Sequence, residues 1–502
     1  MRICVFKARR IGGAVALLVL VWMLLYLPHL RTSPGWYGDE TLTLMIGKSL
    51  YAGEGADRAM LATFWHPSYA YQPGYAWLVG WAAACSDGDI LGGRVLNALL
   101  ALAIALVMYF SGRRLFGGSP ALFSALIFLS YEQSIVHFRW IYSHNAVALG
   151  LVVVVLFLMR KASLRNDVVA GLGLTLAAIS HPLFIHGSLA AWVCRIKRPR
   201  SWIRMAIFPA LAICGLTAWT WLRLTNKNWL FEDIATLGQF YAQFSRDNGS
   251  GFQSLKNVYV FYSQDLFHLG AILLALTCCW RRFYAIPIFL VVVSGLLLQN
   301  RQNLNTFYYQ AVVFLPVLAL AYAAGLRCVL VRLRAMVGRK SRVAILVACI
   351  LPALLFGAAF PKSINGRITP RNQFWVTQNS EEVEAAAEWI NAHVAKTDLV
   401  VCHPNIGWLL KCRTTDFMQA TAWSGRSTFT FEVLPAKERF LFPADICSAK
   451  YAVIGDIDRR WTFGQPNVPW ILDKLQSEKW PMKWQGENYL IIENPKNPMK
   501  AD

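Results

Sequence analysis

The sequence predicts an α-helical polytopic membrane protein with about 11 transmembrane helices and an α/β domain outside the membrane at its C-terminal end. Hydrophobic residues make up 56% of the 502 residues and charged residues only 15%, whereas soluble domains carry about 25% charge. Apolar runs of membrane-spanning length recur up to Phe360 and alternate with short basic clusters. After Phe360 the pattern changes to that of a soluble domain.

The N-terminal segment predicts the first membrane helix. A basic stretch, "MRICVFKARR", precedes the apolar run "IGGAVALLVLVWMLLYLPHL". This run is too long for a usual signal peptide, and no small-residue cleavage site follows it. We therefore expect a cytoplasmic N-terminus. The predicted helices lie near residues 11–30, 90–110, 119–136, 144–159, 168–181, 182–194, 202–222, 264–280, 283–299, 307–325 and 343–360.

The loops predict the orientation. Alternate loops are rich in Arg and Lys, such as "SGRRLFGG", "MRKASLRND" and "CRIKRPRS", and are assigned to the cytoplasm by the positive-inside rule. The opposite loops are longer, aromatic and less basic. The net charge of +21 follows this pattern, which argues against nucleic-acid binding. Eleven crossings from a cytoplasmic N-terminus place the C-terminal domain on the extracytoplasmic side.

The chain divides into a transmembrane domain, residues 1–361, and an α/β domain, residues 362–502. The first outside loop, 31–89, contains "ETLTLMIGKSLYAG", whose apolar spacing predicts a helix lying on the membrane. "WHPSYAYQPGYAWLVGWAAAC" predicts a second segment that is either interfacial or partly inserted in the membrane. In the tail, helical "EEVEAAAEWINAHVAKTD" and "PWILDKLQSEKW" alternate with the strands "DLVVCHP", "KYAVIGD" and "ENYLIIENP". Cys402 and Cys412 either form a disulfide or remain free thiols.

Asp39 and Glu40 are the first candidates for chemistry, because they form a pair of carboxylates close to the expected membrane surface. A carboxylate there is costly without a task or a partner. Asp39 could act as a general base toward a hydroxyl, with Glu40 holding the acceptor, a cation or its neighbour. The alternative is helix capping, since "GDE" precedes an amphipathic helix and Asp is a favoured N-cap.

Cations and aromatic residues of the same outside face are candidates for substrate binding, because they could stabilise a phosphate. Interfacial anchoring by long side chains is the alternative for each one, and isolated histidines are often structural. No HxxxH or HExxH spacing points to a metal site. The candidate substrate-binding residues are Arg139, His144, His66, Arg301, Tyr308 and Tyr309.

The order of several motifs resembles the type C glycosyltransferases, in particular the dolichyl-phosphate-mannose-protein mannosyltransferase and aminoarabinose-transferase group. The "Asp-Glu" pair in "WYGDETLTLMIGKSLYAG" is followed by "HPSYAYQPGYAWL" and then by "GGRVLNALLALAIALVMYFSGRRLFGG". Arg94 and Asn97 stand at the characteristic places of the last stretch. The resemblance extends over about residues 10–200 and is looser to about 360.

The resemblance implies an inverting transferase that takes a sugar from a polyprenyl-phosphate-linked donor to an acceptor hydroxyl on the extracytoplasmic face. Asp39 matches the catalytic base. Arg139 matches a second-loop Arg that holds the departing phosphate, and Arg301 matches only by region. No redox cofactor is required, and a divalent metal is optional. The acceptor is a protein, a lipid or a glycan, and membrane lipids surround the helices. The location that the resemblance implies is a bacterial inner membrane.

One departure separates this chain from the family that it resembles. Many members carry an acid a few residues after the second-loop Arg, where this chain has Asn145. Glu132 or His144 could take over that role.

Within the family, an oligosaccharyltransferase is disfavoured. Oligosaccharyltransferases carry "Asp-x-Asp" with a divalent ion in the first loop, whereas this loop has "Gly-Asp-Glu".

Two other classes of function compete with the transferase. A transporter or flippase of lipid-linked saccharides would require ionisable groups in the middle of helices and pseudo-symmetric halves. The sequence indicates neither feature. A non-catalytic membrane scaffold would leave Asp39 as a helix cap.

Overall fold

The computed structural model describes residues 2–53, 73–223, 251–263, 265–279, 283–298, 312–337, 342–370, 377–428 and 431–497. By their contacts, the residues form two compact units. The first comprises 1–34, 93–218 and 241–372; the second comprises 35–92, 219–240 and 373–502. The described part of the first outside loop after Pro34 thus belongs to the same unit as the C-terminal part of the chain. The predicted boundary between residues 361 and 362 stays a prediction.

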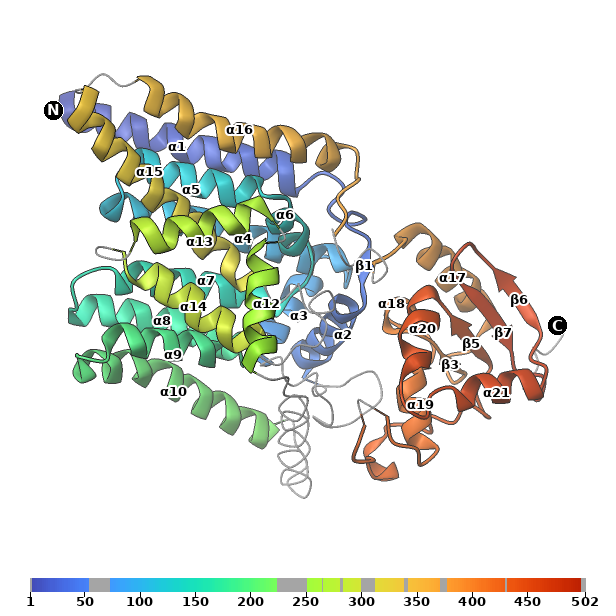
Figure 1. Ribbon diagram of the computed structural model, residues 1–502. Coiled ribbons are helices and arrows are strands. Elements are labelled where there is room, and N and C mark those ends of the chain that lie inside the picture. Colours follow the sequence, from blue (N-terminus) through green and yellow to red (C-terminus); the bar gives the residue numbers. More distant parts are fainter. Residues whose placement is uncertain are drawn as a thin grey trace. The chain divides into compact units, whose positions relative to one another are not determined.

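The first unit is helical, and its elements follow the apolar runs of the sequence (Figure 1). Helices α1 and α16 come from opposite ends of this unit and pack side by side. The helices are α1 (Arg2–Tyr26), α4 (Ile90–Leu115), α5 (Gly118–Ser130), α6 (Glu132–Arg139), α7 (Ser143–Leu158), α8 (Leu164–Ser180), α9 (Phe184–Arg195), α10 (Pro199–Arg223), α12 (Gly251–Ser263), α13 (Leu266–Cys278), α14 (Ala285–Leu298), α15 (Leu315–Val337) and α16 (Arg342–Ile364).

Two helices among the described residues are long and apolar enough to cross a membrane, Ile90–Leu115 and Val312–Arg332. Two further pairs of bent helices, counted as one span each, bring the total to four. The remaining apolar helices are shorter, and a short helix needs tilt or shielding by neighbours to span a bilayer. The predicted number of about 11 crossings therefore stays a prediction.

The prediction of one continuous helix over 119–136 is wrong, because the chain breaks at Tyr131. Helices α5 and α6 meet there at 62°, and Tyr131 has extended backbone angles. The Tyr131 side chain stacks on Phe267 with ring centroids 4.2 Å apart and donates to Asp265 Oδ2 at 2.7 Å. These tertiary contacts hold the break, and local apolar spacing carries no signal of them.

The second unit contains a short ribbon, two helices of the first outside loop and a five-stranded sheet. Strand β1 (Trp36–Tyr37) pairs antiparallel with β2 (Thr377–Gln378). Helix α2 (Gly38–Ala52) follows β1 directly and packs against α3 (Pro73–Ala84). A side chain at Gly47 or Gly80 would collide with the backbone of the other helix, so these two glycines allow close packing. The predicted interfacial helices correspond to α2 and α3.

The sheet has the order β4-β3-β5-β7-β6. Strand β3 pairs parallel with β4 and β5, whereas β7 pairs antiparallel with β5 and β6. The strands are β3 (Leu399–Val401), β4 (Arg413–Thr415), β5 (Tyr451–Ile454), β6 (Met482–Gln485) and β7 (Leu490–Glu493). The connecting helices are α17 (Ser380–His393), α18 (Pro404–Gly407), α19 (Phe417–Trp423), α20 (Asp456–Arg460) and α21 (Trp470–Ser477).

Both faces of the sheet are covered. Alternate strand residues such as Val401 and Ile454 join a core with Phe417 of α19 and Ile471 of α21. On the other face, the ring of Trp389 in α17 lies against Tyr451, with centroids 5.4 Å apart. All three strands and both helices expected in the tail are present.

Candidate functional site

Asp39 lies in the first turn of α2 and not at its N-cap. The N-cap is Tyr37, and Gly38 is the first helical residue. The Asp39 side chain is half-buried, and its Oδ2 accepts a hydrogen bond from the Tyr37 hydroxyl at 2.9 Å. The capping alternative for Asp39 is therefore not what this helix uses. A carboxylate at this position is still favoured by the helix macrodipole.

Glu40, and not Asp39, makes the capping hydrogen bond at the start of α2. Its side chain is buried, and Oε2 accepts from the backbone N–H of Tyr37 at 3.4 Å. A carboxylate at the third helical position that binds the N-cap N–H is half of a capping box. The predicted catalytic role of Glu40 stays untested, and the geometry gives it a structural partner.

Residues of the C-terminal part surround the start of α2. Thr41 Oγ1 donates to Asn405 Oδ1 at 2.9 Å, and the rings of Trp36 and Trp408 meet edge to face at 5.2 Å. Gly38 is required at its position, because a Cβ there would lie 2.7 Å from Cε1 of His403. The turn that carries Asp39 is thus held by β1, by α18 and by the close approach of His403.

Arg139 lies at the end of α6 and is fully buried in the first unit. Nη1 donates to the carbonyl of Ser33 at 2.9 Å. Nη2 donates to the carbonyl of Leu25 at 2.8 Å and to Ser363 Oγ at 2.7 Å. Leu25 is in the last turn of α1, where carbonyls have no partner within the helix. Arg139 therefore links α1, the turn that follows it and α16.

Arg94 holds the same turn from α4. This arginine is also fully buried. Its Nη1 donates to the carbonyls of Leu30 and Pro34, both at 2.9 Å, and lies 3.2 Å from that of Arg31. The turn that follows α1, up to Pro34, is thus fixed by two guanidinium groups, each with several donors in a rigid plane.

Asn145 is a buried structural amide. Its Nδ2 donates to Asn97 Oδ1 at 2.8 Å and to the carbonyls of His137 at 2.9 Å and Trp140 at 3.2 Å. All these partners are acceptors, so the position needs a donor. An ionised carboxylate has none. This explains physically why an asparagine occupies the place where the resemblance leads one to expect an acid.

His144 is buried at the start of α7. Its ring stacks on Tyr142 with centroids 4.2 Å apart and an interplanar angle of 8°. The ring of His181 lies 4.3 Å away on α8's C-cap. The predicted substrate contact of His144 stays a prediction, and its surroundings are those of an aromatic cluster.

Four of the predicted substrate-binding residues lie outside the described residues: His66, Arg301, Tyr308 and Tyr309. Within the described part of the chain, no three His, Cys, Asp or Glu side chains lie close enough together to hold a metal ion. The expectation that a metal is optional stays a prediction. Cys402 and Cys412 are free thiols, which decides between the two alternatives for this pair.

Comparison with known proteins decides the fold. No protein-family model and no curated protein matches the chain. Among solved structures, ArnT from Cupriavidus metallidurans bound to undecaprenyl phosphate is 15% identical with a TM-score of 0.62, over 96% of this chain and 98% of that one. Its apo state gives 14% and 0.59, over 97% and 98%.

The chain has the type C glycosyltransferase fold. A second protein of this fold is the archaeal oligosaccharyltransferase AglB from Archaeoglobus fulgidus, in complex with an inhibitory peptide and a dolichol-phosphate. It is 12% identical with a TM-score of 0.51, over 90% of this chain and 70% of that one. The type C fold that the order of motifs implied is confirmed, whereas the predicted extracytoplasmic α/β domain stays a prediction.

Sequence reasoning missed two structural features around the candidate site. Tyr37, whose hydroxyl binds the Asp39 carboxylate, is two residues from it in "WYGDE", and this spacing is a usable local signal. The hydrogen bonds from Arg94 and Arg139 to the turn after α1 had no such signal. Its acceptors are main-chain carbonyls, which every sequence has at every position.

Proposed function

We propose that the chain is an integral membrane glycosyltransferase that moves a sugar from a polyprenyl-phosphate-linked donor to an acceptor hydroxyl, with inversion, on the extracytoplasmic face of a bacterial inner membrane. The observation that supports it most is the end-to-end likeness of fold to ArnT, which was solved with undecaprenyl phosphate. The half-buried carboxylate of Asp39 at the start of α2 supplies a base for this chemistry.

The proposed step balances as a direct displacement. Asp39 takes the proton of the acceptor hydroxyl, and the acceptor oxygen forms a bond to the anomeric carbon from the face opposite the phosphate. The bond between the anomeric carbon and the phosphate oxygen breaks, and its electron pair leaves with the polyprenyl phosphate. The hydrogen bond from Tyr37 would hold the carboxylate in one orientation during proton transfer.

Negative charge grows on the phosphate as it leaves, so cationic donors must face it. We assign this role first to Arg301, with His66, Tyr308 and Tyr309 as further contacts. Arg139 and His144 are buried and engaged with neighbouring groups. We therefore assign them the task of positioning the helices and not of touching the phosphate.

The experiment that tests the proposal uses the full-length protein in nanodiscs with polyprenyl-phosphate hexose and pentose donors. Release of polyprenyl phosphate is the readout, because water can replace an unidentified acceptor. Asp39→Asn should lower turnover by about 10²–10⁴-fold, the usual contribution of a general base. Turnover should persist in EDTA, since the proposed mechanism needs no metal.

Asp87→Asn is the matched control, because it removes a carboxylate from the same outside loop. Asp87 is exposed and has a left-handed backbone with φ 53°, a conformation that asparagine also tolerates. Turnover by this variant should equal that of the wild type. Wild-type turnover in Asp39→Asn would remove the base assignment. Absence of turnover with every donor, together with movement of the intact donor across the bilayer, would favour a flippase instead.

A further inference from the structure

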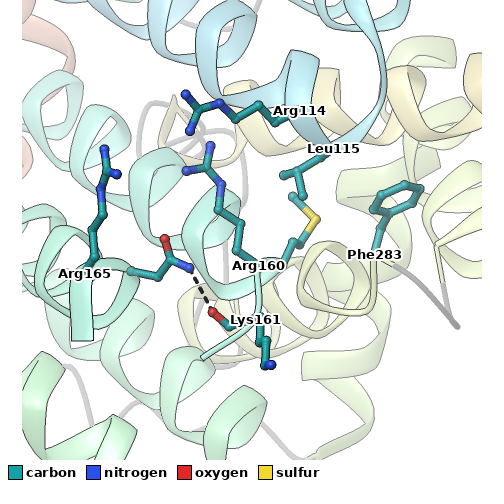
Figure 2. A pocket seen from close by; sticks show the side chains of 8 residues that line it. Arg114, Leu115, Arg160, Lys161, Arg165 and Phe283 are labelled. Carbon is teal, nitrogen blue, oxygen red and sulfur yellow. Dashed lines mark hydrogen bonds between the residues drawn. The ribbon is translucent and has the colours of Figure 1, made fainter. Parts of the chain in front are cut away.

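A cavity of about 430 Å³ lies in the first unit, next to the loops "SGRRLFGG" and "MRKASLRND" that the sequence assigns to the cytoplasm. Its volume falls in the usual range of small-ligand sites. Its wall is formed by the C-terminal end of α4, the loop that follows α7, the first turn of α8 and Phe283, two residues before α14. The lining residues are Arg114, Leu115, Met159, Arg160, Lys161, Arg165, Asn166 and Phe283 (Figure 2).

Three guanidinium groups line this cavity and make it basic. Those of Arg114, Arg160 and Arg165 lie on the same side of it, while the Lys161 side chain points away from them (Figure 2). No lining residue is acidic. Burial, followed by the charges of Arg114 and Arg165, lowers the pKa of Arg160 below its usual value. The three groups therefore repel one another, and a bound anion would relieve this repulsion.

The Arg160 guanidinium is held in place. Its Nη2 donates to the carbonyl of Ser111 at 3.2 Å, and its central carbon lies 4.0 Å from the centre of the Phe157 ring. Its Nε is buried and has no hydrogen-bond partner within the described residues. The loop is also fixed, because Asn166 Nδ2 donates to the Lys161 carbonyl at 2.8 Å. A held guanidinium loses less conformational freedom when it binds an anion.

The acidic residue closest in sequence to these arginines is Asp167, and its carboxylate binds other groups. Asp167 is buried. Its Oδ1 accepts from Ser201 Oγ at 2.7 Å, and its Oδ2 lies 3.5 Å from Nη1 of Arg204. This carboxylate therefore joins α8 to α10 and does not line the cavity.

Membrane topology alone explains basic residues at this end of the helices, but it does not require a cavity. The positive-inside rule is satisfied by exposed cations such as Lys197, Arg198 and Arg200 in the next loop. Arg160, in contrast, is only partly exposed and lines the cavity together with two further guanidinium groups. Planar guanidinium groups bind phosphate oxygens through paired hydrogen bonds.

We propose that this cavity binds a phosphate group, either in the headgroup of an anionic phospholipid or in a soluble phosphate, at the membrane face opposite to sugar transfer. Basic pockets between helices at the cytoplasmic surface are suited to anionic headgroups. The proposal requires the predicted orientation only for naming the face. It does not depend on the sugar-transfer activity.

The test measures binding to delipidated full-length protein. Native mass spectrometry with dioleoyl phosphatidylglycerol, and with phosphatidylcholine as the neutral lipid, reports on the headgroup. Calorimetry with inorganic phosphate reports on the free ion. Arg160→Gln/Arg165→Gln removes two of the guanidinium groups, and Lys197→Gln/Arg200→Gln removes two charges from the neighbouring exposed loop as the matched control.

We expect one preferred phosphatidylglycerol, or bound inorganic phosphate, with affinity reduced at least 10-fold in Arg160→Gln/Arg165→Gln and unchanged in the control variant. Lipid binding without phosphate binding identifies a headgroup site, and the reverse identifies a soluble ligand. If the double variant fails to fold, Arg114→Gln replaces one exposed guanidinium group of the cavity and tests whether affinity for the anion falls. Equal binding by wild type and pocket variants, equal loss in the control, or no binding of either probe would overturn the proposal. Loss of sugar transfer in Asp39→Asn bears on neither outcome.

Discussion

Thr41 Oγ1 donates a hydrogen bond to Asn405 Oδ1 at 2.9 Å across 364 residues of sequence. Thr41 follows directly on the Asp39-Glu40 pair in α2, and Asn405 lies in α18 after the strand β3. Both side chains are buried. The helix that presents the proposed base is thus tied to the α/β part of the same unit, which gives that part a role in positioning the carboxylate.

The bond between Thr41 and Asn405 should be measurable as a coupling energy. Thr41→Val and Asn405→Ala should each lower the free energy of unfolding by about 1–3 kcal/mol, because each leaves a buried polar partner unpaired. The double variant should lose less than the sum, by about 1 kcal/mol. Urea unfolding of the full-length protein in detergent measures this. Additive losses would mean that the two side chains do not interact.

Tyr37→Phe should reduce turnover without abolishing it. The phenol hydroxyl donates to Asp39 Oδ2 at 2.9 Å, and a hydrogen bond to a carboxylate favours its ionised form. Without it, the acid limb of the pH–rate profile should move to higher pH. Turnover on that limb should fall by about 10-fold, which corresponds to the loss of one hydrogen bond to a charged group. The readout is release of polyprenyl phosphate between pH 5 and 8.

Tyr51→Phe is a matched control for that change, since Tyr51 lies at the far end of α2 and is exposed. Its profile should coincide with that of the wild type. An unshifted acid limb in Tyr37→Phe would show that the hydroxyl does not tune the base.

Asn145→Asp should destabilise the protein and not restore an acid function. The aspartate would face Asn97 Oδ1 and two carbonyl oxygens that now accept from the Asn145 amide. Buried acceptors without a donor, beside a buried charge, cost about 2–5 kcal/mol. The thermal unfolding midpoint should fall. A folded variant with higher turnover would instead show that an acid at this position contributes to catalysis.

Asp458 should make the stability of the second unit depend on pH. Burial raises the pKa of this carboxyl from 3.8 to about 7, and the neighbouring charge of Asp416 adds to the increase. The folded state therefore keeps a proton that the unfolded chain releases between pH 4 and 7. The free energy of unfolding should fall as the pH rises through this window, by at most about 1.4 kcal/mol per pH unit.

Asp458→Asn should flatten that dependence. The side-chain oxygen of asparagine can still accept from Gly455 N, which lies 3.0 Å from Asp458 Oδ2. Asp456→Asn, at a more exposed site with ion pairs to Arg459 and Arg460, is the control and should keep the wild-type slope. Urea titrations of the full-length protein at pH 5, 6, 7 and 8 provide the measurement. A slope retained in Asp458→Asn would assign the proton to another group.

Most of the elements were predictable because they depend on local patterns. Helices α4 and α7 follow the apolar runs 90–110 and 144–159, and α17 follows the acidic-start amphipathic segment near its N-cap Asn379. Apolar spacing and cap residues act within a few residues of one another. The break at Tyr131 was not predictable from such spacing, because Asp265 and Phe267 hold it from another helix.

The candidate site also combines features that local sequence predicts with features that depend on distant segments. Asp39 was identified from its distance to the first apolar run, but its place inside the first turn of α2 depends on the pairing of β1 with β2. Arg139 was expected to bind phosphate from its loop and its charge. Its burial against Ser33, Leu25 and Ser363 arises from the meeting of three distant segments.

The sequence by itself determined the helical runs, the alternation of basic loops, the α/β tail and the acidic pair, because length, hydropathy and charge order are properties of neighbouring residues. Only the tertiary structure decided that Glu40 caps α2, that Asn145 is a donor to carbonyls, and that Arg114, Arg160 and Arg165 gather around one cavity. Each of these facts depends on which side chain or carbonyl the path of the chain brings within about 3–4 Å, the range of hydrogen bonds and close packing.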